Sequence, residues 1–535
     1  MHGRHLNGVP QFFMEELYRQ WSDWLRTKYQ SEDSLRKAWA GNLFEWESLD
    51  SNSVALLPLS PDYRGEAQAR SLGINIAASR SGQVSNESFN RLRGADVIEF
   101  LLKIWIEAKQ AEANELKTWG RSTSLCPLVW DTGIGYDLPT QYMQQHADAI
   151  AHDSYMNGTM HPDPGHRRFP WFSALEELPK MCWDRPWLEQ NRMPGKPFFV
   201  YENQIMQPAK YRGEHALRMA SLGSIQDWDI VIFHYWGVPP DPDLPAPYER
   251  PMDYTYSERS HPQGYHFQYD DVQQSAISLA GEIFKNFLLS PAPSPTLFVF
   301  GRKSLYDPNM LAYGTAGDRF LATTYRYGMR LVIDPTRETD EIRGPSRRRS
   351  VYEGNPIEPT DAISYDWQKG HLLLDSPSAA AYTGFYAQYG GPIRFKNGVS
   401  LRGVRIHNDA GIAYTVKDDE KYLTFALAST DGKPLADSRK VRLTLMSTSF
   451  NSGFVIDESK VTGEWFWQKG SHPKGTGSLP ILYARVEADI EVPMLDGMRY
   501  RLLDWHLRSI ADGVVERGVL SIPGNSPVFI VELTR

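Results

Sequence analysis

The stretch KPFFVYENQ, residues 196–204, joins a run of β-forming residues to a carboxylate. Residues 198–201 favour a β-strand, and Pro197 is compatible with the first position of such a strand. A glutamate after an apolar run usually marks the return of the chain to solvent, which is the simplest interpretation of Glu202. A chemical role for Glu202 therefore depends on what the neighbouring segments place beside it.

Short apolar runs alternate with helical stretches on both sides of this strand. LCPLVWD (125–131), ADAIAHDSY (147–155) and DIVIFHYWG (229–237) each predict a further strand. Residues 211–228 predict a helix of the length that a crossover between parallel strands requires, and residues 272–289 predict a last helix. Strands that alternate with helices indicate a parallel sheet covered by helices, so the expected fold class is α/β.

The amino-terminal segment predicts three helices and one long irregular connection. Residues 14–30 carry apolar side chains at helical spacing, and a second helix follows Ser31 as its N-cap. Residues 46–92 lack periodicity. A strong helix is expected to begin at Asp96, because Asp96 and Glu99 have the spacing of a capping box.

Beyond residue 290 the pattern changes to short alternating strands separated by turn signals. TDGKPL at 430–435 predicts a hairpin-like turn. We therefore expect a (β/α)-type region over residues 1–290, a connecting β-containing region over 291–360, and a β-rich, sandwich-like domain over 361–535.

The composition argues against nucleic-acid and membrane partners. The formal net charge is −8 and the pI is near 6.0, and the basic cluster RGPSRRRS at 343–350 is interpreted as a solvated loop rather than part of a basic stripe. The mean hydropathy is −0.47, and no segment approaches 18 apolar residues. The first residues lack the apolar stretch of a signal peptide, so the chain as given is expected to stay in the cytoplasm unless a segment upstream is missing. Aromatic residues make up 12%, which suits surfaces that stack on sugars.

The cysteines and histidines predict neither a disulfide framework nor a metal site. Cys126 and Cys182 are the only cysteines in the sequence, and both are expected to be free thiols. Several histidines fall in one region, but their spacing matches no ligand signature. They are His146, His152, His161 and His166.

The predicted parallel strands end in polar or aromatic residues. These are Asp131, Tyr155, Glu202 and Trp236. In a (β/α) barrel the carboxyl ends of the strands form the face that carries the chemistry. There a carboxylate can attack an anomeric carbon, a tyrosine can hydrogen-bond to that carboxylate, and a tryptophan can form a floor under a sugar ring.

The order of these segments resembles the retaining clan A glycoside hydrolases, the group that includes cellulase-like, β-galactosidase-like and agarase-like enzymes. KPFFVYENQ, the helix at 211–228 and DIVIFHYWG are similar to the seventh strand, helix and eighth strand of their barrel. ADAIAHDSY looks like the sixth strand and LCPLVWDTG like the fifth. The resemblance implies Glu202 as the catalytic nucleophile and no cofactor. It also implies substrate-binding roles for His152, Tyr155, Trp236, His234 and Asp131.

One departure from the family concerns the general acid/base. In these enzymes it is a glutamate, usually after an asparagine, at the end of the fourth strand, and that strand would precede residue 1. The two Asn-Glu pairs of the chain, at 86–87 and 114–115, lie in a polar stretch and inside a predicted helix. The chain thus resembles strands five to eight of a TIM-type barrel. We expect that a second copy of the chain or a partner chain supplies the other half, or that the segment 46–92 folds over the gap.

The resemblance and the missing acid/base strand leave two predicted functions, an enzyme and a non-catalytic binding protein. The first is a retaining glycoside hydrolase that acts on a β-linked oligo- or polysaccharide through a glycosyl ester on Glu202. The alternative is a non-catalytic carbohydrate-binding remnant, or one half of a split glycosidase that lacks its own acid/base. Sugar selectivity lies in loops that vary on a common barrel, so the resemblance does not specify the sugar.

Overall fold

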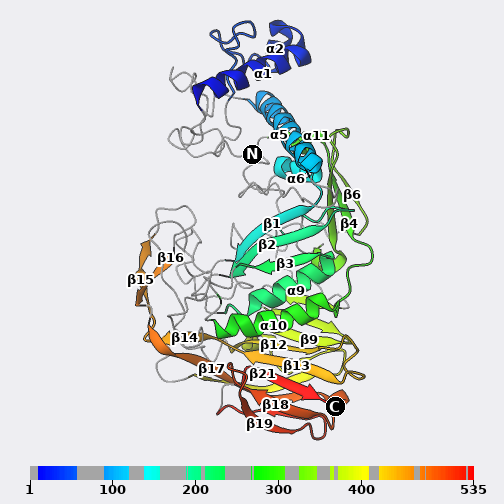
Figure 1. Cartoon of the computed structure of the whole chain (residues 1–535), viewed down its shortest axis with the longest axis vertical. Helices are drawn as coiled ribbons and strands as arrows, with labels where there is room; N and C mark the ends of the chain where they lie inside the picture. The colour runs from blue at the N-terminus through cyan, green and yellow to red at the C-terminus, as the bar shows by residue number, and fades with distance from the viewer. Residues whose placement is uncertain are drawn as a thin grey trace.

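The protein is a mixed α/β structure with a large antiparallel sheet near its carboxyl end (Figure 1). A computed structural model describes residues 10–56, 90–119, 138–156, 188, 191–205, 211–234, 267, 270–307, 324–345, 362–366, 371–408, 421–462, 470–475, 477–525 and 528–535. Helices α1 and α2 lie at one end of the molecule and the antiparallel strands lie at the other.

The first two helices agree with the sequence prediction. Helix α1 spans Gln11–Tyr29 and helix α2 spans Glu32–Ala38. The hydroxyl of Ser31 accepts a hydrogen bond from the amide of Ser34 at 3.2 Å, so the predicted N-cap of α2 is confirmed. The described part of the connection that follows, up to residue 56, packs back on these helices.

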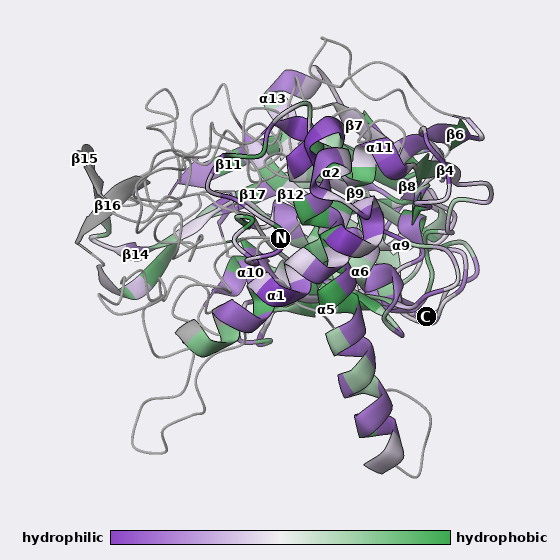
Figure 2. Cartoon of the chain, turned by 90° about the horizontal axis from the view of Figure 1, so that it is seen from above, coloured by the Kyte–Doolittle hydropathy of each residue, from purple (hydrophilic) through white to green (hydrophobic). Residues whose placement is uncertain are grey.

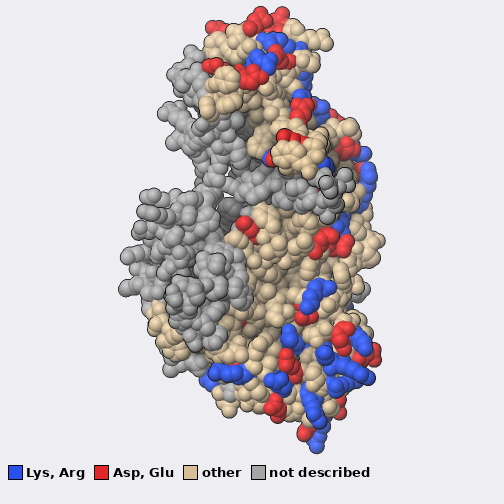
Figure 3. All heavy atoms as spheres, viewed as in Figure 1, with Lys and Arg blue, Asp and Glu red and all other residues tan. Residues whose placement is uncertain are grey.

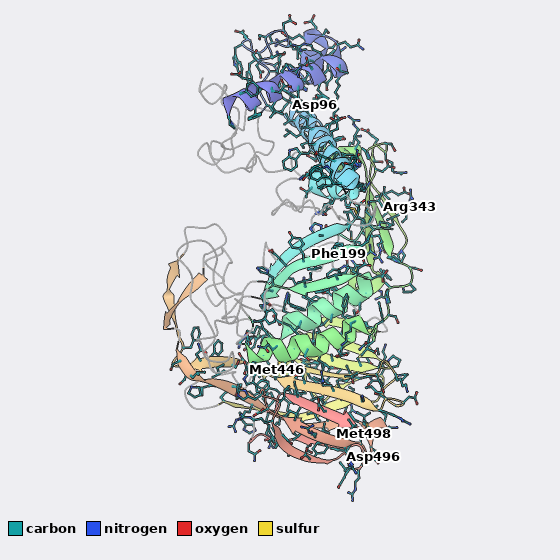
Figure 4. The ribbon with its side chains drawn as sticks, viewed as in Figure 1. Asp96, Phe199, Arg343, Met446, Asp496 and Met498 are labelled. Carbon is teal, nitrogen blue, oxygen red and sulfur yellow. The ribbon has the colours of Figure 1, made fainter. Side chains whose placement is uncertain are left out.

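The long helix α5, Arg91–Trp119, begins five residues before the predicted start. Asn90 accepts the hydrogen bond from a first-turn amide, so the capping box predicted at Asp96 is wrong. Asp96 lies inside the helix instead, where its buried carboxylate accepts hydrogen bonds from Lys28 and from the Trp39 indole, both at 2.8 Å (Figure 4). Figure 2 shows α5 banded in hydrophilic and hydrophobic colours, as an amphipathic helix requires.

Three parallel strands form the sheet that carries the predicted site. They are β1 (Ile150–Met156), β2 (Phe198–Ile205) and β3 (Ile230–Phe233), in the spatial order β1-β2-β3. Helix α9, Glu214–Gln226, connects β2 to β3 as predicted, and α10, Asp271–Lys285, packs beside it. The strand predicted at 125–131 lies outside the described residues. Among those that are described, no strand joins β1 to β3, so this sheet is open and no barrel is closed.

A second small sheet is attached to the end of α9. Strands β4 (Thr296–Phe300) and β5 (Met329–Ile333) are parallel, whereas β6 (Glu341–Arg343) is antiparallel to β4. Figure 4 labels Arg343 on β6. The amide of Met329 donates to the side chain of Gln226 at 2.8 Å, which ties β5 to α9. Two short helices belong to this region, α6 (Leu138–Gln145) and α11 (Arg302–Leu305).

The carboxyl-terminal region is β-rich, as predicted. The eight-stranded sheet has the order β19-β18-β21-β13-β12-β9-β8-β7, and the five-stranded sheet has the order β10-β11-β17-β14 with β20 on β17. The first sheet comprises β7 (Ile363–Asp366), β8 (His371–Ser376), β9 (Ala379–Phe385), β12 (Tyr422–Ser429), β13 (Lys440–Met446), β18 (Arg499–Leu503), β19 (Ser509–Val514) and β21 (Ile530–Thr534). The second comprises β10 (Ile393–Arg394), β11 (Ser400–Asn408), β14 (Ser449–Ser452), β17 (Ser478–Glu491) and β20 (Val519–Ile522), and β15 (Val455–Thr462) pairs with β16 (Gly470–Gly475) as a separate ribbon. Short helices α13 (Tyr386–Tyr389) and η9 (Pro493–Leu495) complete the region.

Strand alternation gives the eight-stranded sheet two different faces. One face packs against the five-stranded sheet through residues such as Phe425 and Leu443. On the other face Ala426 and Met446 belong to the core that α9 and α10 share with the parallel sheet (Figure 4). Gly213, just before α9, allows this approach, because a Cβ atom there would lie 3.0 Å from the hydroxyl of Thr424. The eight-stranded sheet thus supports the helices that follow β2 and β3.

Candidate functional site

Glu202 lies within β2 rather than at its end. It is the fifth of eight strand residues, so the prediction that the strand stops at this carboxylate is wrong by three residues. The register changes at this point, because His152 of β1 pairs with Val200 whereas Asp153 pairs with Glu202. Tyr201 is therefore the extra residue of a β-bulge. Bulges turn the side chains beside them and are frequent next to active sites.

The bulge also changes which side chains of β2 face the core. Phe198 and Val200 are fully buried before it, and Asn203 and Ile205 are buried after it. Strict alternation would have placed Asn203 and Ile205 on the opposite face from Phe198 and Val200. Tyr201 and Glu202, which are only partly buried, stand where that alternation is interrupted, and the three residues after them are all buried.

Asn203 ties β2 to both of its neighbours directly after Glu202. Its side-chain nitrogen donates to the carbonyl of Ile232 on β3 at 2.6 Å, and its oxygen lies 2.9 Å from Nε2 of His215 on α9. Since the amide nitrogen is used as a donor, the oxygen accepts, and His215 carries its proton on Nε2. Burial lowers the pKa of His215 well below its usual value, and the positive charge of Arg218 lowers it further. His215 is therefore neutral at pH 7.

The sequence prediction did not include Asn203 or His215. Their only sequence signal is position: one follows the candidate carboxylate and the other lies in the first turn of the crossover helix. In a βα unit that turn packs on the strand before it.

His152 and Tyr155 both belong to β1 but occupy different positions. The buried ring of His152 lies 5.9 Å from the ring of Phe198, and burial lowers its pKa to about 3, so His152 is also neutral at pH 7. Tyr155 pairs in register with Gln204, two positions beyond Glu202. The side chain of Tyr155 is outside the described part of the structure. Substrate-binding roles for both residues stay predictions.

The remaining predicted residues are only partly placed. His234 follows β3 directly, and its amide donates to the carbonyl of Asn203 at 2.9 Å. Asp131 and Trp236 lie outside the described residues. The parallel sheet therefore brings the backbones of His152, Tyr155 and His234 close to that of Glu202. Figure 1 shows the carboxyl ends of these strands directed toward the side of the molecule on which β15 and β16 lie.

A second polar cluster, which the sequence did not indicate, connects the starts of α9 and α10 to the antiparallel strands. Arg212 is fully buried, pairs with Asp270, and donates to the backbone carbonyl and the hydroxyl of Ser449 at 2.9 and 2.8 Å. Asp270 is also the N-cap of α10, because it accepts from the amide of Gln273 at 3.1 Å. Ser449 is the first residue of β14. We call Arg212, Asp270, Asp271 and Ser449 the junction cluster.

Asp271 is the unusual member of the junction cluster. Burial raises its pKa to about 6, and the negative charge of Asp270 contributes to the rise. Its Oδ1 accepts from the hydroxyl of Ser449 at 2.5 Å, while its buried Oδ2 has no hydrogen-bond partner within the described residues. Because a buried, unpaired carboxylate oxygen is costly, folding shifts the titration of Asp271 toward higher pH.

Asp271→Asn should change how the free energy of unfolding depends on pH. A carboxyl whose pKa is higher in the folded than in the unfolded state makes the folded protein less stable as the pH rises from about 4 through 6. The amide does not titrate. The unfolding free energy of the variant relative to the wild type should therefore rise by on the order of 3 kcal/mol between pH 4 and pH 8. Urea unfolding at a series of pH values measures this difference, with the exposed Asp50→Asn as the control. A difference that does not vary with pH would contradict the prediction.

Neither a metal-binding cluster nor a membrane-spanning helix is found among the described residues. Among the described residues, no group of three or more His, Cys, Asp and Glu side chains could hold a metal ion. None of the helices in the described ranges is both long and apolar enough to span a bilayer. Comparison with protein-family models, curated proteins and solved structures found no match for this chain.

Proposed function

We propose that the chain is a retaining glycoside hydrolase that cleaves O-glycosidic bonds of a β-linked oligo- or polysaccharide, with Glu202 as the nucleophile. The observation that supports this most is the position of Glu202. It stands at a β-bulge in the central strand of a parallel sheet, in the half of the strand nearer its carboxyl end. Ligands of α/β proteins bind at that end of the strands. We further propose that β1, β2 and β3 are strands six to eight of a TIM-type barrel.

The proposed first step forms a covalent glycosyl-enzyme. A carboxylate oxygen of Glu202 attacks the anomeric carbon, the bond from that carbon to the leaving oxygen breaks, and the leaving oxygen takes a proton from the general acid/base that would face Glu202. Water then attacks the same carbon, releases the sugar and restores the carboxylate. Tyr155 would hydrogen-bond to Glu202, and Trp236 would form the floor for the sugar ring. This chemistry needs no cofactor.

Asn203 and His215 support the proposal by fixing the backbone on one side of Glu202. Catalytic groups act best when neighbouring hydrogen bonds hold them in the productive geometry. The two hydrogen bonds of the buried Asn203 side chain, to Ile232 and to His215, secure β2 directly after the bulge. Both partners belong to regular elements, β3 and α9, rather than to loops.

The alternative is a carbohydrate-binding remnant or one half of a split glycosidase, and one observation favours it. Parallel sheets of α/β proteins are normally covered on both faces. Yet Ile230 and Ile232 of β3 are 42% and 49% exposed, and the described sheet is open. A second copy of the chain or a partner chain could cover this sheet and supply the acid/base.

Activated aryl glycosides test both forms of the proposal. A 2,4-dinitrophenolate leaves without a proton, so Glu202 can be glycosylated even when no acid/base faces it. Without a base the ester should persist, and mass spectrometry should find the added sugar on the peptide that contains Glu202. Added azide should shorten its lifetime, because azide attacks without base assistance. No labelling by any glycoside of a broad panel would favour the binding remnant, and efficient cleavage of natural oligosaccharides without an azide effect would show that an acid/base is present.

A further inference from the structure

On the face of the eight-stranded sheet that also meets α9 and α10, the strand register aligns charged residues across four strands. Arg442 of β13 pairs with Glu532 of β21, Glu532 pairs with Arg501 of β18, and Arg501 pairs with Asp512 of β19. The residues between them along each strand, such as Leu443 and Leu502, face the core. The charged side chains therefore lie together on the opposite face from this core, where α9 and α10 pack further along the strands. Figure 3 shows Lys, Arg, Asp and Glu side chains gathered over this end of the molecule.

A second row of residues runs beside the first and lies two residues from it on each strand. Here Lys440 of β13 pairs with Thr534 of β21, and Thr534 pairs with Arg499 of β18. Lys440 and Arg499 are exposed, and within the described parts of the chain neither side chain has an ion-pair partner. We call Lys440, Arg442, Arg499 and Arg501 the basic ladder.

The arginines of the basic ladder are poorly paired compared with other arginines of the same chain. Arg442 and Arg501 lie 3.5 and 3.9 Å from Glu532, and Arg501 lies 3.8 Å from Asp512. These distances exceed those of hydrogen bonds, and no side-chain hydrogen bond is made by the ladder within the described residues. Elsewhere exposed arginines form close pairs, such as Arg337 with Glu341 at 2.8 Å and Arg508 with Asp504 at 2.8 Å.

The ladder is locally positive on an acidic protein. Its four cations face two carboxylates, Glu532 and Asp512, which leaves a local charge of +2 (4 − 2), whereas the whole chain carries −8. No basic stripe is visible in the sequence, because the four cations come from two segments that are far apart along the chain. Only the pairing of β13, β21 and β18 assembles them. Guanidinium groups with unused donors recognise carboxylates and sulfates through paired hydrogen bonds.

We propose that the basic ladder binds an acidic polysaccharide, one that carries carboxylate or sulfate groups along an extended chain. Its cations extend over about 10 Å across the strands and about 7 Å along them, which suits a polymer with repeated charges better than a single small anion. The two carboxylates within the ladder would repel a dense polyphosphate, and neither row contains an aromatic residue on which a base could stack. The choice of a glycan as the polymer rests on the proposed function, and it narrows the substrate class to acidic glycans.

Binding of fluorescent polygalacturonate and dextran sulfate tests the ladder, with uncharged dextran as the neutral polymer. The test variant is Lys440→Gln/Arg499→Gln/Arg501→Gln. The control variant, Arg19→Gln/Arg337→Gln/Arg343→Gln, removes the same charge from exposed arginines that are hydrogen-bonded or closely paired. We expect the intact chain to bind an acidic polymer but not dextran, the ladder variant to lose about tenfold or more in affinity, and the control variant to lose about twofold or less.

Three outcomes would overturn the inference. They are equal losses in the two variants, no binding of either acidic polymer at low salt, and tighter binding of a single-stranded oligonucleotide than of the acidic glycans. The binding measurement involves no catalysis. A chain that binds through the ladder but labels with no glycoside would therefore refute the proposed function and leave the ladder intact.

Discussion

Glu202→Gln is expected to lower the turnover of 2,4-dinitrophenyl glycosides by about 10⁴- to 10⁶-fold, the range seen when an enzyme loses its nucleophile. The amide has nearly the same shape as the carboxylate but cannot form the glycosyl ester. Glu202 is only partly buried, so the exchange should not disturb the core of β2. Steady-state release of dinitrophenolate measures the loss. The exposed Glu338→Gln is the matched control and should keep full activity.

A second replacement separates a nucleophile from a structural carboxylate. In Glu202→Gly, azide can enter the vacated space and attack the anomeric carbon itself, forming a carbon–nitrogen bond as dinitrophenolate departs. The product should be a glycosyl azide of inverted anomeric configuration, because a single displacement replaces two. A merely structural role for Glu202 would give no such product. Full activity in Glu202→Gln would remove this residue from the mechanism.

The regular elements near the site could be predicted because their signals are local. The apolar run before Glu202 and the small-residue helix that follows it appear as β2 and α9, with boundaries shifted by a few residues. Ser31 caps α2 because an N-cap depends on its own first turn. Asp96 shows the limit of this approach. Its capping-box spacing was present, but Asn90 caps the helix instead, and the Asp96 carboxylate accepts hydrogen bonds from Lys28 and Trp39, which are distant in sequence.

The features that give the candidate site its geometry are long-range. The bulge at Tyr201 is visible only when β2 is aligned with β1, and the hydrogen bonds of Asn203 need β3 and α9 in place. The junction cluster joins Arg212 to Ser449, which is 237 residues away. Neither periodicity nor local spacing reveals such pairings. The sequence could therefore indicate Glu202 as a candidate, but not the hydrogen bonds that position the strand around it.

The largest expected loss of stability follows Arg93→Met. Arg93 and Glu47 form an ion pair in which both side chains are fully buried. The guanidinium also donates to the carbonyls of Asn42 and Ala55 at 2.9 and 2.8 Å and lies 4.5 Å from the ring centre of Trp39. Methionine fills much of the space but leaves the Glu47 carboxylate buried without its cation. Loss of one partner of a buried ion pair costs about 3–5 kcal/mol.

Hydrogen exchange of amides in α1 and α2 measures this loss locally. These helices pack with the start of α5 around Trp21 and Trp39, so the free energy of their opening should fall by about 3–5 kcal/mol in Arg93→Met. Arg19→Met removes an exposed arginine of α1 that pairs with Glu16, and should leave the exchange rates almost unchanged.

The double variant Arg93→Met/Glu47→Gln shows whether the cost arises from the unpaired charge. Glutamine is neutral, and its oxygen can still accept one of the two backbone hydrogen bonds that Glu47 receives, from Phe44 and Ala55 at 2.9 and 2.7 Å. The double variant should therefore be destabilised by less than the sum of the single changes, with a coupling on the order of 2 kcal/mol. Strictly additive losses would mean that Arg93 stabilises this end of the molecule through its carbonyl contacts and Trp39 rather than through Glu47. Because the pair has no solvent to screen it, the coupling should persist at high salt, where that of an exposed pair such as Arg19–Glu16 would fade.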